Sequence, residues 1–138
     1  MAVITLKGRR IPLIYTVWEM NQIQEEIAPL GEFQYLICGR TKDDEEDTSK
    51  YGGPEHLSAV AKLIKILGNA GLEEEGENPD LTEKKILRAL KPTDLVEAVN
   101  ACMVAMDEGM RSEIPAEPGE GPVDETLEKI NKKKVKDG

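Results

Sequence analysis

Hydrophobic residues recur every three or four positions along residues 95–110, a spacing that places them on one face of an α-helix. This face comprises Leu95, Val99, Cys102, Met106 and Met110, with Ala98, Ala101, Met103 and Ala105 beside it. Polar side chains such as Glu97, Asn100 and Asp107 take the opposite side. Because a helix with one apolar face is not stable alone in water, the pattern predicts that neighbouring helices cover it.

Another helix is predicted immediately before this one, over residues 83–91. Thr82 can accept a hydrogen bond from the free amides of its first turn, and Leu81 and Ile86 have the spacing of a hydrophobic staple. Pro92 lacks an N–H group and disfavours a helical conformation in the residue before it, so the helix should end there. Thr93 is then the expected N-cap of the helix that follows.

Residues 57–70 have an apolar arc that is wider than one face of a surface helix. One face is formed by Leu57, Val60, Ile64 and Leu67, and the adjacent face by Ala59, Leu63, Ile66 and Ala70. An arc of this width indicates contacts with two or more neighbours, which predicts a central helix. Gly71 is the expected stop of this helix.

The amino-terminal part of the chain begins with two short β-prone runs, residues 3–6 and 11–15, separated by a turn at residues 7–10. They predict a β-hairpin in which Pro12, lacking an amide proton, lies at an outward-facing edge position. A helix is expected over residues 16–28, and a short one over residues 32–38. The apolar face of the first is expected to contain Val17, Met20, Ile23 and Ile27.

Trp18 falls off that apolar face, and the sequence leaves two interpretations open. In the first, its indole covers the hairpin. In the second, it is an exposed aromatic anchor for a protein partner, since tryptophan is enriched at binding hot spots.

These elements predict a mainly α fold, a small helical domain over residues 1–112 with an N-terminal β-hairpin. Residues 39–54 and 73–80 are expected to be loops. Residues 113–138 begin with a segment rich in proline and glycine, which predicts a flexible linker and charged tail. Within this tail, residues 124–135 could form a short helix with Val123, Leu127 and Ile130 on one side.

The charge of the chain limits its partners. It has 138 residues and a formal net charge of −9, and basic residues cluster only near the C-terminus. Binding to a nucleic-acid backbone requires clustered cations, so nucleic acid is not an expected partner. Apolar runs are too short to cross a bilayer and no signal-peptide core is present, so a soluble, intracellular protein without a membrane partner is expected.

No catalytic or metal-binding motif is evident, and we expect neither enzyme activity nor a cofactor. The acidic run of residues 43–47 lacks the alternating ligands and the central glycine of a calcium-binding loop and is expected to be solvated. The single histidine, His56, has no catalytic arrangement around it and is expected at the surface. Cys38 and Cys102 lack metal-ligand spacing and are expected to be buried or half-buried thiols.

The candidate site is therefore an apolar surface that binds protein. Met103, Met106 and Met110 have flexible, polarizable side chains, which suit a loosely packed core and an adaptable binding surface alike. Together with Trp18 and Val99 they are the candidate protein-binding residues.

The order of the segments resembles that of the tail assembly chaperones of long-tailed bacteriophages and prophages. The resemblance is carried by ITLKGRRIPLIYTVWEM at the start, LGNAGL, an acidic loop, and NPDLTEKKILRALKPTDLVEAVNACMVAMDEGM, and it extends loosely through GEGPVDETLEKINKKK. It covers most of residues 3–111.

The resemblance implies a non-enzymatic chaperone in the bacterial host cytoplasm. Such a protein binds the tape measure protein, keeps this long helical chain soluble until tail tube protein polymerises around it, and is absent from the mature virion. Two other functions stay open: a structural connector that is retained in the particle, and an acidic decoy that binds a protein partner.

The resemblance also implies a possible frameshift-extended form of the protein, because many family members are also made as longer products. Lys132, Lys133 and Lys134 lie where a slippery codon run could be, but they are equally consistent with a plain basic tail.

Overall fold

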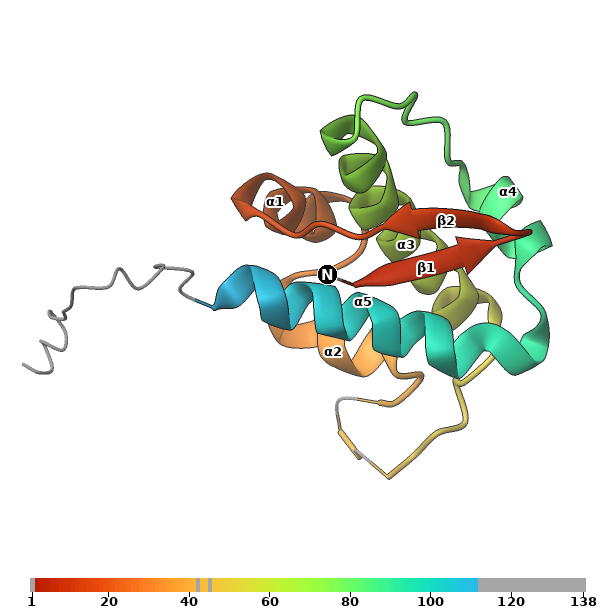
Figure 1. Ribbon diagram of the computed structural model, residues 1–138. Helices are drawn as coiled ribbons and strands as arrows, with labels where there is room; N and C mark the ends of the chain where they lie inside the picture. The colour runs from red at the N-terminus through yellow and green to blue at the C-terminus, as the bar shows by residue number, and fades with distance from the viewer. Residues whose placement is uncertain (1, 42, 45, 112–138) are drawn as a thin grey trace, which may run out of the picture.

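The computed structural model describes residues 2–41, 43–44 and 46–111 and is mainly helical (Figure 1). In chain order its elements are β1 (Val3–Leu6), β2 (Arg9–Pro12), α1 (Val17–Glu26), α2 (Leu30–Ile37), α3 (Pro54–Glu74), α4 (Glu83–Ala89), the 3₁₀ turn η1 (Pro92–Asp94) and α5 (Leu95–Met110). The predicted mainly α class with an N-terminal hairpin is confirmed. The predicted tail, residues 113–138, and its short helix lie outside the described residues.

The hairpin turns more tightly than the sequence suggested. Lys7 and Gly8 form a two-residue turn, and both have positive φ angles, 49° and 81°, as a type I′ turn requires. The second strand therefore begins at Arg9, opposite Leu6, and ends at Pro12, opposite Val3. The predicted strand at residues 11–15 is wrong at its start because the turn needs two residues rather than four, and wrong at its end because pairing stops at Pro12, opposite the first residue of β1.

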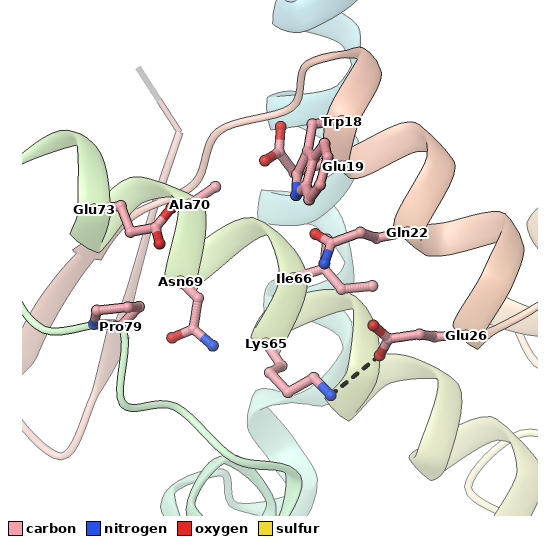
Figure 2. A pocket seen from close by; sticks show the side chains of 10 residues that line it. All are labelled: Trp18, Glu19, Gln22, Glu26, Lys65, Ile66, Asn69, Ala70, Glu73 and Pro79. Atoms are coloured by element: carbon pink, nitrogen blue, oxygen red, sulfur yellow. Dashed lines mark ion pairs between the residues drawn. The ribbon is translucent and has the colours of Figure 1, made fainter.

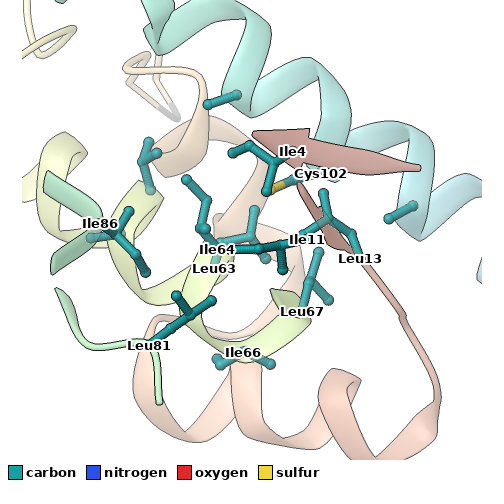
Figure 3. Close-up of a cluster of buried hydrophobic side chains, with 14 of the residues drawn as sticks. Ile4, Ile11, Leu13, Leu63, Ile64, Ile66, Leu67, Leu81, Ile86 and Cys102 are labelled. Atoms are coloured by element: carbon teal, nitrogen blue, oxygen red, sulfur yellow. The ribbon is translucent and has the colours of Figure 1, made fainter. Parts of the chain in front are cut away.

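Helix α3 lies at the centre of the molecule, as its wide apolar arc predicted. It contacts α1, α2, α4, α5 and β2. Figure 3 shows its side chains Leu63, Ile64 and Leu67 among Ile4 and Ile11 of the hairpin and Ile86 of α4. The hairpin lies between α3 and α5, with β2 against α3 and β1 against α5 (Figure 1).

The predicted end of α3 at Gly71 is wrong, because the helix continues to Glu74. Its C-terminus is closed instead at Gly76, which has a φ of 77°. The N–H of Gly76 donates to the carbonyl of Glu73 at 3.0 Å, and the N–H of Glu77 donates to that of Leu72 at 2.8 Å. Paired hydrogen bonds of this kind satisfy the last carbonyls of a helix when a glycine adopts the left-handed conformation.

Gly71 has a different role, which is to let the hairpin approach α3. A Cβ atom at this position would lie 1.8 Å from the carbonyl oxygen of Pro12. One turn earlier, the carbonyl of Leu67 accepts a hydrogen bond from the N–H of Ile14 at 3.2 Å. Pro12 is at the last position of an edge strand, as expected, but it is buried against α3 rather than facing outward.

The segment that leads into α5 agrees with the sequence except at one cap. The Thr82 hydroxyl accepts from the N–H of Lys85 at 3.2 Å, which confirms the N-cap of α4. Thr93 does not cap α5, because residues 92–94 form the 3₁₀ turn η1 and Asp94 becomes the N-cap residue. The Asp94 carboxylate accepts from the N–H of Lys91 at 3.0 Å and thereby holds this turn.

We predict that Gly71→Ala lowers the free energy of unfolding by about 1–3 kcal/mol, the usual cost of forcing a methyl group into a packed interface. The matched control is Gly31→Ala in α2, where a Cβ would have no neighbour within 4 Å. Alanine there should raise stability by about 0.5–1 kcal/mol, since it favours the helix. Urea unfolding of both variants measures the difference, and equal stability of the two would contradict the close approach of Pro12.

Candidate protein-binding surface

Trp18 is exposed on α1, with 69% of its surface accessible. It lies at one end of a groove of about 250 Å³ between α1 and α3, and the ion pair that Glu26 and Lys65 form at 3.1 Å lies toward the other end, beyond Gln22 (Figure 2). Its predicted covering of the hairpin is therefore wrong. The alternative, an aromatic anchor for a partner, stays a prediction that is compatible with this exposure.

The rotation of α1 about its axis explains the exposure of Trp18. Glu19 is buried, and its carboxylate accepts from the backbone N–H of Thr16 at 2.8 Å and from the Thr16 hydroxyl. This arrangement closes the start of the helix and turns Glu19 inward. Val17 and Trp18 consequently face solvent, so the predicted place of Val17 on the apolar face is also wrong.

Helix α5 carries two apolar stripes rather than one. The inner stripe, Leu95, Ala98, Cys102 and Ala105, is buried against the core. The outer stripe runs beside it and consists of Val96, Val99, Met103, Met106 and Met110.

The outer stripe has alternating steps of three and four residues, which is the heptad spacing of helices that pair with another helix. Val99, Met103 and Met106 are half-buried and pack against the core, whereas Val96 is 55% and Met110 76% exposed. The sequence placed Val99, Met106 and Met110 in the same seam as Leu95 and Cys102, and the structure separates them. Val96 was missed, although the heptad spacing could have found it.

The structure does not bring all five candidate residues into one pocket. The groove at Trp18 is lined by residues of α1, α3 and the loop that follows α3, and by none of α5. Trp18 and the outer stripe are therefore two candidate contacts on different elements.

His56 is 1% exposed, so the expectation that it lies at the surface is wrong. Its Nδ1 accepts from the N–H of Gly52 at 2.9 Å, and its Nε2 lies 3.0 Å from the carbonyl oxygen of Ile37. Both bonds form together only when the neutral ring carries its proton on Nε2. The two hydrogen bonds join the end of α2 to the loop that precedes α3. The centroid of the Tyr51 ring lies 4.8 Å from that of the His56 ring.

Acidic side chains of the loop between α2 and α3 hold its own turns. The Asp44 carboxylate accepts from the N–H of Glu46 at 3.0 Å, and that of Asp47 from the N–H of Ser49 at 2.9 Å. The backbone hydrogen bond from Ser49 lowers the pKa of Asp47 from its ordinary value. Among the described residues, no three His, Cys, Asp or Glu side chains lie close enough together to bind a metal ion.

Comparison with known proteins found no match to this chain among protein-family models, curated proteins or solved structures. The resemblance to tail assembly chaperones therefore stays a prediction from the order of its segments. Within the described part of the chain, no helix combines the length and the apolar character needed to cross a membrane.

The two cysteines differ in environment, which gives a test of how α5 packs. Cys38 is exposed, contrary to the expectation of a buried or half-buried thiol, whereas Cys102 is fully buried in the inner stripe. Burial raises the pKa of the Cys102 thiol to about 12.

We predict that the folded protein reacts with one equivalent of a disulfide thiol reagent at pH 8, and the urea-unfolded protein with two. The thiolate is the nucleophile, and Cys102 in its buried position stays protonated at this pH. The variant Cys38→Ser is the control and should not react until it is unfolded. Rapid reaction of the folded Cys38→Ser protein would show that the inner stripe is not buried.

Proposed function

We propose that this protein is a non-enzymatic chaperone of phage tail assembly, which binds helical segments of the tape measure protein and keeps them soluble until the tail tube polymerises. The observation that carries the proposal is the outer stripe of α5, an apolar surface with heptad spacing that no other element of the described chain fully covers. The identity of the partner rests on the resemblance of the segment order to tail assembly chaperones.

The dimensions of the outer stripe suit a partner helix. From Val96 to Met110 the stripe extends about 21 Å along α5, close to two heptads at 1.5 Å per residue. Side chains at heptad spacing insert between those of a facing helix. The three methionines can adjust to different side chains, which is useful when the partner is a long chain with many helical segments.

The partial burial of the stripe suits transient binding. Val99, Met103 and Met106 already pack against the core, so a partner removes only their remaining surface and that of the exposed ends from water. The stabilisation gained is proportional to the apolar area that is buried, at about 25 cal/mol per Å². A small area favours reversible binding, as a chaperone that leaves its client requires. The net charge of −9 favours solubility of the complex.

We predict that Val96→Glu combined with Met110→Glu abolishes the gain in solubility when the protein is co-expressed with the tape measure protein of its gene cluster. Both side chains are exposed, so the fold should tolerate the charges, whereas a helix docked on the stripe should not. Co-purification should fall at least about tenfold, equivalent to about 1.4 kcal/mol of binding free energy.

The matched control is Val104→Glu, an exposed valine of α5 that lies off the stripe and is 49% accessible. It should co-purify like the unsubstituted protein. Equal loss for both variants would point to a general charge effect, and no co-purification by the unsubstituted protein would refute the proposal.

A structural connector would use the same stripe but would stay in the particle. We predict that mass spectrometry of purified, complete tails detects no peptide of this protein, because a chaperone leaves when the tube replaces it on the tape measure protein. The tail tube protein in the same sample is the positive control. A fixed stoichiometric amount of this protein would favour the connector.

A further inference from the structure

A second apolar surface lies at the corner where α4, η1 and α5 meet. It is a cleft of about 360 Å³, lined chiefly by Tyr51, Leu57, Leu87, Leu90, Pro92 and Leu95. Tyr51 and Leu87 keep much of their surface exposed, so apolar area remains open to water. The cleft is separate from the outer stripe and from the groove at Trp18, and the proposed function does not use it.

One edge of this cleft is basic, although the protein as a whole is acidic. Lys91 is the charged residue that lines the cleft, and Arg88 directly follows the lining residue Leu87 on α4; both side chains are exposed. No carboxylate of the described residues forms an ion pair with them. The neighbouring Asp94 already accepts the N–H of Lys91, and Glu55 pairs with Lys50 at 3.6 Å. An acidic segment with one bulky apolar side chain would complement both the cleft and its edge.

The chain itself contains such a segment beyond the described residues. In residues 123–128, Leu127 is surrounded by Asp124, Glu125 and Glu128. The end of α5 at Arg111 lies about 24 Å along that helix from Leu95 at the cleft, at 1.5 Å per residue. The chain between Arg111 and Leu127 spans up to about 50 Å at 3.3 Å per residue, so Leu127 can reach the cleft.

We propose that residues 123–128 dock on this cleft in the same molecule, with Leu127 among its leucines and Asp124, Glu125 and Glu128 against Arg88 and Lys91. A short flexible tether gives a tethered segment an effective concentration in the range of about 1 mM, so docking requires an affinity only in the millimolar range. Because the contact forms in the free protein, it does not depend on the identity of the client.

The test uses the full chain with ¹³C-labelled leucine methyl groups and a nitroxide spin label at Thr126→Cys, in a Cys38→Ser background that leaves only the buried Cys102. We expect the label to broaden the methyl signals of Leu87 and Leu90, and to leave those of Leu72, about 22 Å along α3 from the cleft residue Leu57, sharp. The substitution Leu127→Asp should remove the broadening.

The matched control is Ile114→Asp, an equal change in the same tail at a residue only three positions beyond Arg111, a reach of about 10 Å, too short for the cleft. It should leave the broadening unchanged. Charge reversal by Arg88→Glu with Lys91→Glu should weaken the broadening at least about threefold, and Asp124→Lys, Glu125→Lys and Glu128→Lys together should restore it.

Mixing spin-labelled protein with separately ¹³C-labelled protein identifies the source of the segment. Broadening only within one molecule supports the proposal. Broadening between molecules would overturn it in favour of a second copy as the occupant. Sharp Leu87 and Leu90 signals in every sample, or equal broadening after Leu127→Asp, would overturn it as well, whereas failure to solubilise the tape measure protein would bear only on the proposed function.

Discussion

The structure depends on the close approach between β2 and α3. Gly71 has no side chain, and the carbonyl of Pro12 occupies the space that a Cβ would take. The hydrogen bond from Ile14 to Leu67 continues this contact along α3. A two-stranded hairpin is marginally stable in water, so its attachment to α3 is what gives it a fixed position. Once the hairpin is fixed, β1 provides the surface on which α5 lies, and α5 in turn covers the apolar side of the hairpin.

The position of α5 divides its apolar residues into the inner stripe, which is buried in the core, and the outer stripe, which keeps surface available to a partner. Small residues at Ala98, Cys102 and Ala105 let the helix lie close to the core. Gly109 allows a similar approach near the C-terminus, where a Cβ would lie 2.2 Å from the carbonyl oxygen of Tyr15. The adjacent valines and methionines are too far around the helix to be covered completely. This partial coverage supports our proposal that the protein binds helical segments of another protein.

Several local features were predictable because short-range chemistry decides them. Thr82 caps α4 since its hydroxyl is adjacent to free amides, and Pro92 ends that region because it has no N–H group. Other features depend on groups that are distant in the sequence. His56 was expected at the surface, yet its ring is buried between the backbone of Gly52 and that of Ile37, nineteen positions earlier. No pattern around His56 contains that information.

The type and order of the elements, including the hairpin, the central helix and the apolar character of α5, were predictable because hydrophobic periodicity and turn residues act over a few positions. Three other features depend on long-range packing: Gly71 is a contact rather than a helix stop, Trp18 faces solvent, and Met110 lies outside the buried face. The period of a helix shows which residues share a side. Which part of that side is covered depends on where β1 and α3 are placed, and long-range packing fixes that placement.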